Sequence, residues 1–228
     1  MRLMIIDTAL GLCTAGVFEV DGTDVRRLGL RSEPMVKGHS ERIAGFARDA
    51  MAEAGRGFDA LDRIGVTTGP GSFTGLRVGL AFAKGLAAAL DRPLVGISTL
   101  DALAASVEAA PTVAALIDAR RGQVYARIWR EGAADGPAGA LTLAAAAERI
   151  AGMGAGAVLV GSGAALFADL ASGPGLRPLD GPAPEALARL AAAADPALAP
   201  ATPLYLRAPD ATPPTRLPGQ ARAPAPTP

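Results

Sequence analysis

The chain has 228 residues, in which 22 Lys and Arg balance 22 Asp and Glu, and it contains one histidine and one cysteine. A neutral chain offers nucleic acid no general electrostatic attraction, so we expect another subunit to supply the positive surface for any work on RNA. One cysteine and one histidine exclude an internal disulfide and any Cys-rich or multi-histidine metal site within the chain. Zinc hydrolase chemistry is therefore not expected.

Half of the residues are hydrophobic, which is enough for a substantial core. The start of the chain shows no charged-then-apolar leader pattern, and no run of 18 apolar residues lacks a charge. We therefore expect a soluble, cytoplasmic protein. Cys13 lies in an apolar alternation and is expected to be a small buried residue.

The first half of the chain predicts strands and helices in alternation. One apolar run ends at Asp7, another at the hairpin signal Asp21-Gly22, and Ser40 is a candidate N-cap for the helix that follows. The expected elements are strands at 2–6, 12–20 and 24–31, a helix at 40–54, a strand at 64–68, a helix at 75–90 and a strand at 94–98.

The pattern restarts near residue 106. An apolar run again ends in an aspartate, Asp118, and a turn at Arg121-Gly122 leads into a returning strand. The expected elements are strands at 112–117 and 123–130, a helix at 142–151, a strand at 157–161, a helical stretch at 164–171 and a helix at 184–194. From residue 208 onward, seven of 21 residues are proline, and we expect this tail to be disordered.

A strand, an aspartate, a turn and a returning strand thus occur twice, at Asp7 and at Asp118. This repetition predicts an α/β protein of actin-like or ribonuclease H-like fold, with two similar lobes that each hold a mixed β-sheet flanked by helices. We place an N-terminal lobe at 1–105, a smaller C-terminal lobe at 106–207 and the tail at 208–228.

The most informative stretch joins the strand at 64–68 to the helix at 75–90 and reads Gly-Pro-Gly-Ser-Phe-Thr-Gly-Leu-Arg-Val-Gly over residues 69–79. It lacks the lysine and hydroxyl residue of a P-loop. A dinucleotide-binding turn would need an acidic residue after the next strand, where Ser98 and Thr99 stand. Two readings remain: a closely packed turn, or a turn whose free N–H groups bind an anion or a partner's acceptor.

The helix at 75–90 carries apolar residues at helical spacing, and three small ones, Gly75, Gly79 and Ala83, stand four apart. Such a face can admit a partner's helix closely, or it can cover the chain's own sheet. At the start of the helix, Thr74 can form a cap through its hydroxyl, and Arg77 can reach a carboxylate or phosphate of a partner.

Six short motifs are spread along residues 1–207. They are Ile5-Ile6-Asp7-Thr8, His39-Ser40-Glu41, the stretch 69–87, Gly96-Ile97-Ser98-Thr99-Leu100, the stretch 118–125 and Pro203-Leu204-Tyr205-Leu206-Arg207. In these motifs the chain resembles the TsaB family, also called YeaZ. The resemblance implies a two-lobed actin-like fold and a non-catalytic role as partner of TsaD, which transfers threonylcarbamoyl to adenosine 37 of tRNA with TsaE as an ATPase helper.

The resemblance also implies the remaining partners. A second copy of the chain would bind when TsaD is absent, tRNA would bind only through the complex, and no membrane is involved. The chain alone would bind no cofactor, and ATP and a metal would be held by the partner subunits. Helices 40–54 and 75–90 would pair with their counterparts in TsaD.

The interface residues that follow from this implied pairing share the two helices and the turn before the second one. They are His39, Ser40, Ile43, Phe46, Ala47, Ala50, Ser72, Thr74, Gly75, Leu76, Arg77, Gly79, Leu80, Ala83 and Leu86. No residue is expected to be catalytic, because the lone histidine has no paired acid or nucleophile at a recognisable spacing. Residues expected near a nucleotide phosphate are Asp7, Thr8, Asp118, Arg120 and Arg121.

Two other classes of protein remain open at this point. One is a free-standing actin-like ATPase or sugar kinase. The turn after Asp7, Thr8-Ala9-Leu10-Gly11, argues against this class because it has few of the glycines that wrap a phosphate. The other is a peptidase, for which neither a metal ligand set nor a nucleophile elbow is evident.

Overall fold

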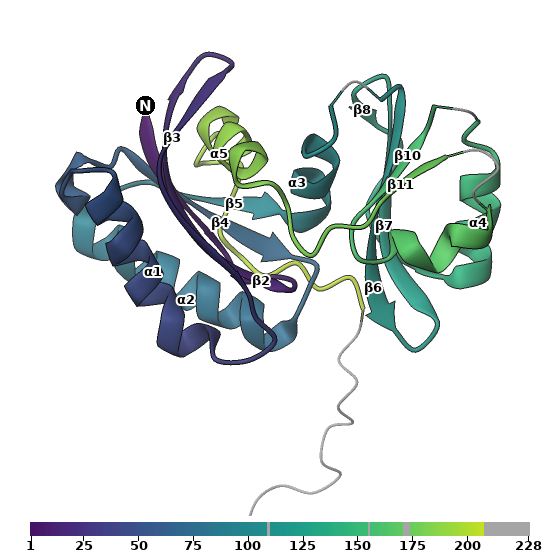
Figure 1. Cartoon of the computed structure of the whole chain (residues 1–228), viewed down its shortest axis with the longest axis horizontal. Helices are drawn as coiled ribbons and strands as arrows, with labels where there is room; N and C mark the ends of the chain where they lie inside the picture. The colour runs from purple at the N-terminus through teal and green to yellow at the C-terminus, as the bar shows by residue number, and fades with distance from the viewer. Residues whose placement is uncertain (109, 155, 171–173, 208–228) are drawn as a thin grey trace, which may run out of the picture.

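The computed structural model describes residues 1–108, 110–154, 156–170 and 174–207. It contains two β-sheets, each in its own lobe and flanked by helices (Figure 1). Both sheets mix parallel and antiparallel strands, which confirms the expected α/β architecture of two similar lobes. The tail at 208–228, for which disorder was predicted, lies outside the described residues.

The first lobe is built on a five-stranded sheet in the order β3-β2-β1-β4-β5. Strand β1 pairs antiparallel with β2 and parallel with β4, and β5 continues the parallel half. Every strand expected in this lobe is found, and β3 runs past its predicted end at residue 31. The bounds are Arg2–Asp7 (β1), Leu12–Asp21 (β2), Asp24–Pro34 (β3), Arg63–Gly69 (β4) and Leu94–Ser98 (β5).

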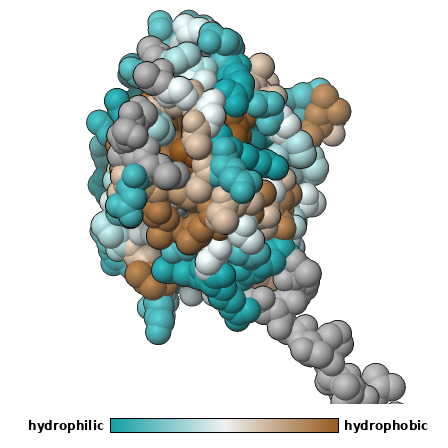
Figure 2. Space-filling model, turned by 90° about the vertical axis from the view of Figure 1, so that its right-hand side faces the viewer, coloured by the Kyte–Doolittle hydropathy of each residue, from teal (hydrophilic) through white to brown (hydrophobic). Residues whose placement is uncertain are grey.

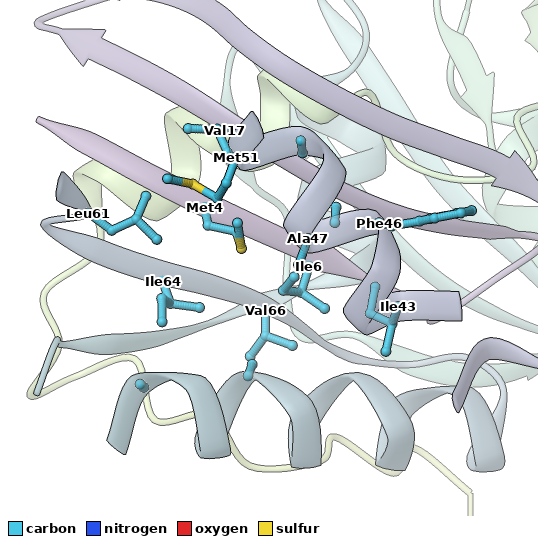
Figure 3. Packing of buried hydrophobic residues seen from close by; sticks show 14 of the residues in the cluster. Met4, Ile6, Val17, Ile43, Phe46, Ala47, Met51, Leu61, Ile64 and Val66 are labelled. Atoms are coloured by element: carbon cyan, nitrogen blue, oxygen red, sulfur yellow. The ribbon is translucent and has the colours of Figure 1, made fainter. Parts of the chain in front are cut away.

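Helices cover both faces of this sheet because alternate side chains of a strand point to opposite faces. Met4 and Ile6 pack beneath α1 (His39–Glu53) and α2 (Phe73–Leu90), as Figure 3 shows. Leu3 and Ile5 pack on the other face with α5 (Pro184–Ala193). The outer sides of α1 and α2 therefore face away from the core.

The second lobe holds a sheet in the order β11-β10-β6-β7-β8, with β9 also paired to β7. One face packs against α4 and the 3-10 helix η2, and the other packs against α3. The bounds are α3 (Thr99–Ala105), β6 (Thr112–Arg120), β7 (Gln123–Arg130), β8 (Ala133–Ala134), β9 (Gly139–Thr142), α4 (Leu143–Ala151), β10 (Val158–Val160), η2 (Ala164–Leu170) and β11 (Gly175–Arg177).

Figure 2 looks onto the outer side of the second lobe, where apolar residues gather near the middle of the face between polar ones. A small hollow of about 10 Å³ lies in this lobe beneath β7 and α4. A hollow of about 510 Å³ lies in the first lobe and is described below.

Several short elements of the structure were not predicted from the sequence. Helix α3 is apolar on most sides because it lies between the lobes: Ala102 packs with α5, whereas Leu100 and Leu103 pack against the second sheet. Strands β8, β9 and β11 and the 3-10 helix η1 (Phe58–Ala60) are too short to show a periodicity. The stretch predicted as helical at 164–171 is a kinked 3-10 segment over its described part, 164–170.

Helix α1 begins one residue earlier than predicted. Gly38 occupies the N-cap position with φ of 87°, a left-handed conformation that glycine adopts without steric cost, and it offers no side-chain hydrogen bond. Ser40 is an exposed residue inside the first turn. The prediction that Ser40 caps this helix is therefore wrong.

The predicted lobe boundary also needs correction, because the chain returns to the first lobe near residue 180. The N–H of Gly11 donates to the carbonyl of Asp180 at 2.9 Å, and helix α5 lies on the first sheet. The guanidinium of Arg63 donates to the carbonyls of Ala191, Ala192 and Ala194 at the end of α5. The C-terminal lobe thus ends before α5 rather than at residue 207.

After α5, residues 195–207 form a strap that runs along both lobes (Figure 1). Gly96 donates its N–H to the carbonyl of Ala199, and Leu204 donates its N–H to the carbonyl of Thr68. At the end of the strap, Arg207 donates to the carbonyl of Ala119 in the second lobe at 2.9 Å. The strap therefore ties the edge of the first sheet to strand β6.

Candidate functional site

An open groove of about 510 Å³ lies between the outer sides of α1 and α2. Its walls are mostly apolar, with hydroxyls and one guanidinium at one end. The lining residues are Ser40, Ile43, Ala44, Phe73, Thr74, Arg77, Val78, Ala81 and Phe82. The groove is lined by two helices and opens to solvent, and it is our candidate site.

The turn before α2 fixes the position of the groove. Ser72 donates its N–H to the carbonyl of Ala9 at 2.7 Å, and the hydroxyl of Thr8 donates to the carbonyl of Gly75 at 2.7 Å. A Cβ at Gly71 would collide with the carbonyl of Ala9, and a Cβ at Gly75 would collide with the carbonyl of Thr8. The glycines are therefore required by close packing against the turn after β1, which is the first of the two readings given to this stretch.

Ser72, not Thr74, caps helix α2. The Oγ of Ser72 accepts a hydrogen bond from the N–H of Gly75 at 3.2 Å, and Thr74 lies exposed in the first turn. The sequence offers two hydroxyl residues as candidate caps, Ser72 and Thr74. An N-cap residue must lie just before the first helical residue, and the backbone places Ser72 in that position. The prediction for Thr74 is corrected accordingly.

Three side chains form one end of the groove. The ring of Phe73 is 56% exposed, the guanidinium Cζ of Arg77 lies 3.9 Å from its centroid, and the ring of Tyr205 lies 5.7 Å away, centroid to centroid. Nε of Arg77 donates to the hydroxyl of Tyr205 at 3.5 Å. The strap thus brings Tyr205 against Phe73 and Arg77 at the start of α2, beside the groove.

Most of the predicted interface residues face inward, which corrects that prediction. Gly79 lies against Thr8 and Ile6 of the first lobe, so the small residues of α2 let the helix approach β1 and not a partner. The buried members of the predicted set are His39, Ile43, Phe46, Ala47, Ala50, Gly75, Leu76, Gly79, Leu80 and Ala83. Leu86 is partly buried, and the exposed members are Ser40, Ser72, Thr74 and Arg77.

Five lining residues were missed by the sequence reasoning. The sequence did carry a signal for them. Helix α2 has apolar residues on more than one side, whereas a helix that only covers a sheet needs a single apolar stripe. Helix α2 is in fact long and apolar enough to meet a composition test for a membrane span, a test that core helices also pass. The missed residues are Ala44, Phe73, Val78, Ala81 and Phe82.

Asp7 and Thr8 do not face an open phosphate site. Both are 1% exposed, and Oδ1 of Asp7 accepts from the N–H of Ala9 at 3.0 Å and from the hydroxyl of Thr67 at 2.7 Å. The turn at 69–75 and the segment around Gly181 cover them. The prediction that they lie near a nucleotide phosphate is therefore wrong.

Burial raises the pKa of the Asp7 carboxyl, since an ionised oxygen is poorly solvated there, and the bonds from Ala9, Thr67 and the charge of His39 oppose the shift. Oδ2 of Asp7 and Nε2 of His39 are both buried and have no hydrogen-bond partner among the residues that the structure describes. Burial, helped by Asp7 and Glu33, also raises the pKa of Cys13 to about 11. The buried Cys13 matches its expected role as a small core residue.

Asp118, Arg120 and Arg121 lie at the tip of the hairpin joining β6 and β7. Arg120 pairs with the Asp118 carboxylate at 3.1 Å, and both arginines are exposed. Within the described ranges, no group of three or more His, Cys, Asp and Glu side chains could hold a metal ion. None of the three residues lines the α1–α2 groove.

Comparison with known proteins now places this geometry in a family. The family model described as TsaD, tRNA N6-adenosine threonylcarbamoyltransferase, matches residues 28–148, more than half of the chain. The Escherichia coli tRNA threonylcarbamoyladenosine biosynthesis protein TsaB is 35% identical over 134 residues, which are 58% of this chain and 54% of that protein. The chain therefore spans about half the length of this relative.

Two further relatives match along nearly the whole chain. An uncharacterized protein of Mycobacterium tuberculosis is 35% identical over 211 residues, covering 92% of this chain and 94% of its own. The solved structure of YeaZ from Pseudomonas aeruginosa has a TM-score of 0.73 and 28% identity, and covers 90% of this chain and 99% of its own. The chain accordingly belongs to the TsaB (YeaZ) group of the TsaD family.

Proposed function

We propose that this chain is a non-catalytic subunit that binds TsaD through the α1–α2 groove and activates it for threonylcarbamoyl transfer to adenosine 37 of tRNA. The observation that carries the proposal is the groove itself, whose apolar walls include the exposed ring of Phe73 and the partly buried side chains of Val78 and Phe82, which also pack against the core beneath α2. Exposed apolar surface of this kind marks protein interaction sites. The pathway in the proposal comes from the names of two relatives, which are both tRNA threonylcarbamoyladenosine biosynthesis proteins.

The polar end of the groove suits recognition of a protein. Arg77 is held by the ring of Phe73 and the hydroxyl of Tyr205, which leaves its remaining N–H groups directed at a partner's carboxylate or carbonyl. An apolar floor with a charged, aromatic rim is the usual anatomy of such a site. An interface of standard size would bury about 1,600 Å² in total.

Two observations support the non-catalytic part of the proposal. The aspartate that would face a phosphate, Asp7, is sealed by the chain's own backbone, and no metal cluster occurs in the described parts of the chain. We accordingly propose that ATP and a metal belong to the partner subunits, and that TsaE joins the same complex. A second copy of the chain would occupy the groove when TsaD is absent, and the assembly would work in the cytoplasm on tRNA.

The test is to purify the chain with TsaD of its own organism and to assay tRNA modification with and without it. Ala81→Arg places a long charged side chain on the exposed floor of the groove and should abolish the complex and the modification. Ala52→Arg puts the same change on an exposed alanine of α1 outside the groove and serves as the matched control.

Loss of the complex with Ala81→Arg and not with Ala52→Arg supports the groove as the binding site. Equal complex formation by both variants would overturn it. If the wild-type chain formed no complex and hydrolysed ATP or phosphorylated a sugar alone, the actin-like ATPase or kinase reading would replace the proposal.

A further inference from the structure

The groove between α1 and α2 lies beside the point where the strap ends. Tyr205 of the strap packs on Phe73 at the start of α2, with ring centroids 5.7 Å apart, and the strap ends two residues later at Arg207. The bond from Arg207 to the carbonyl of Ala119 fixes this end of the strap. The segment that follows residue 207 therefore begins within a few residues of the groove.

The end of the groove nearest the strap is aromatic and carries one guanidinium. The side chains of Phe73 and Tyr205 are 56% and 48% exposed. In the described ranges, Arg77 contacts the ring of Phe73 and the hydroxyl of Tyr205 and pairs with no carboxylate. This end of the groove thus offers a ligand two aromatic rings and a partner for one carboxylate.

Residues 208–228 follow the strap and lie outside the described residues, and their composition complements the groove. They include seven prolines, with Leu217 as the single large hydrophobic residue and Asp210 as the single acidic one. Such a segment cannot bury its apolar groups in a core of its own, so these groups are available to an apolar surface elsewhere. Proline-rich segments bind grooves lined by aromatic side chains.

The order of residues in this segment matches the order of features along the groove. Asp210 comes three residues after the strap, close enough in the chain for its carboxylate to reach Arg77, and Pro213 and Pro214 follow it. The part of α2 that lines the groove, residues 73–82, is about 14 Å long. An extended chain covers about 3.3 Å per residue, so residues 208–228 are long enough to run along the whole groove.

We propose that residues 208–228 fold back into the α1–α2 groove of their own chain, and that TsaD must displace them in order to bind. Asp210 pairs with Arg77, and the prolines that follow pack on the aromatic side chains of α2. Because the segment is tethered, its effective concentration at the groove is in the millimolar range, so weak contacts are enough to occupy it. The competition with TsaD rests on the proposed function, whereas the contact within the chain does not.

A nitroxide label tests the contact directly in the full chain without TsaD. The label is attached at Thr215→Cys, and Cys13 is buried, so the introduced thiol is the one that reacts. We expect the backbone NMR signals of Ala44 and Ala81, which line the groove, to lose most of their intensity, and the signal of the exposed Ala52 outside the groove to keep it.

Two controls make this experiment decisive. The loss at Ala44 should disappear in Ala81→Arg, which fills the groove, and persist in Ala52→Arg, which does not. Equal intensity at groove and control positions in the labelled chain would overturn the proposal. A loss that appears only when nitroxide-labelled and isotope-labelled copies are mixed would place the segment in the groove of a second copy, and would overturn it as well.

The affinity for TsaD tests the competition. Asp210→Lys reverses the charge that faces Arg77, so the full-length variant should bind TsaD about two- to tenfold more tightly than wild type. Glu148→Lys makes the same reversal on an exposed residue of α4 and should bind as wild type does. An unchanged affinity for Asp210→Lys would overturn the competition. If the wild-type chain did not bind TsaD at all, the proposed function and the competition would both fall, whereas the nitroxide experiment would still decide whether the segment occupies the groove.

Discussion

The guanidinium of Arg77 lies over the ring of Phe73, with Cζ 3.9 Å from the ring centroid. The two residues stand one helical turn apart at the start of α2, and Tyr205 from the strap completes the group. Residues four apart on a helix are neighbours, and an exposed cation–π pair is worth about 0.5–1 kcal/mol. The pair orders a large apolar surface and a cation at the mouth of the groove before any partner binds.

Truncating either member should weaken partner binding. We expect Phe73→Ala and Arg77→Ala each to lower the affinity for TsaD about tenfold, because buried aromatic and arginine side chains dominate protein interfaces. Isothermal titration calorimetry checks this, with Arg48→Ala on α1 as a control outside the groove. Unchanged affinity for both variants would show that this end of the groove stays open in the complex.

The glycines of α2 should differ sharply in their tolerance of alanine. In Gly75→Ala the new Cβ meets the carbonyl of Thr8, so we expect a loss of about 1–3 kcal/mol in the free energy of unfolding. In Gly85→Ala nothing lies within 4 Å, and the helix should gain about 0.5–1 kcal/mol. Urea unfolding of both variants provides the comparison, and a similar change in both would contradict the close packing of the turn.

The two hydroxyls at the start of α2 should contribute unequally. Ser72→Ala removes the acceptor for the N–H of Gly75 and should cost about 1 kcal/mol of stability. Thr74→Ala touches no such bond and should change stability by less than about 0.5 kcal/mol. Thermal melting of the two variants distinguishes them, and a larger loss for Thr74→Ala would return the cap to that residue.

The stability of the protein should fall as the Asp7 carboxyl ionises. Its pKa is raised above 3.8 by burial, so the folded state holds this proton more tightly than the unfolded state does. The stabilisation is fully present below about pH 3.8 and is lost as pH rises through the native pKa. Asp7→Asn cannot titrate, so the free energy of unfolding of the variant should rise relative to wild type across this window.

Urea unfolding of wild type and Asp7→Asn at a series of pH values measures this difference directly. Subtracting the two curves cancels the other titrating groups, which both proteins share. Parallel curves would mean that the Asp7 carboxyl keeps an ordinary pKa despite its burial.

Cys13 should react very slowly with alkylating reagents in the folded protein. Its side chain is fully buried and its pKa is about 11, so at pH 8 only about one molecule in a thousand carries the reactive thiolate. We expect iodoacetamide to modify the urea-unfolded chain readily and the native chain hardly at all, as read by mass spectrometry. Comparable rates in both states would contradict the burial of this strand.

The sequence alone determined the local structure. The strands, the helices and the two-lobed plan were predicted from three local patterns, because such patterns depend only on neighbouring residues. They are the apolar run at 2–6, the aspartates at the end of β1 and near the end of β6, and the glycine turn at 69–75. The glycine-rich motif and its accompanying stretches also pointed to the family to which the chain belongs. Four residues that line the groove, Ser40, Ile43, Thr74 and Arg77, belong to the interface set that the family resemblance implied, and their role in binding a partner stays a prediction.

Only the tertiary structure decided which surfaces remain exposed. Helix α2 has apolar residues on two stripes, and the contact of Gly79 with Thr8 selects the inner one, which leaves Phe73 exposed and Phe82 partly buried in the wall of the groove. The bond from Arg63 to Ala191 joins residues 128 apart and returns α5 to the first lobe. The hydrogen bond from Thr67 to Asp7 and the bond from Arg207 to Ala119 likewise join distant segments, and such contacts leave no periodicity in the sequence because each depends on how the whole chain packs.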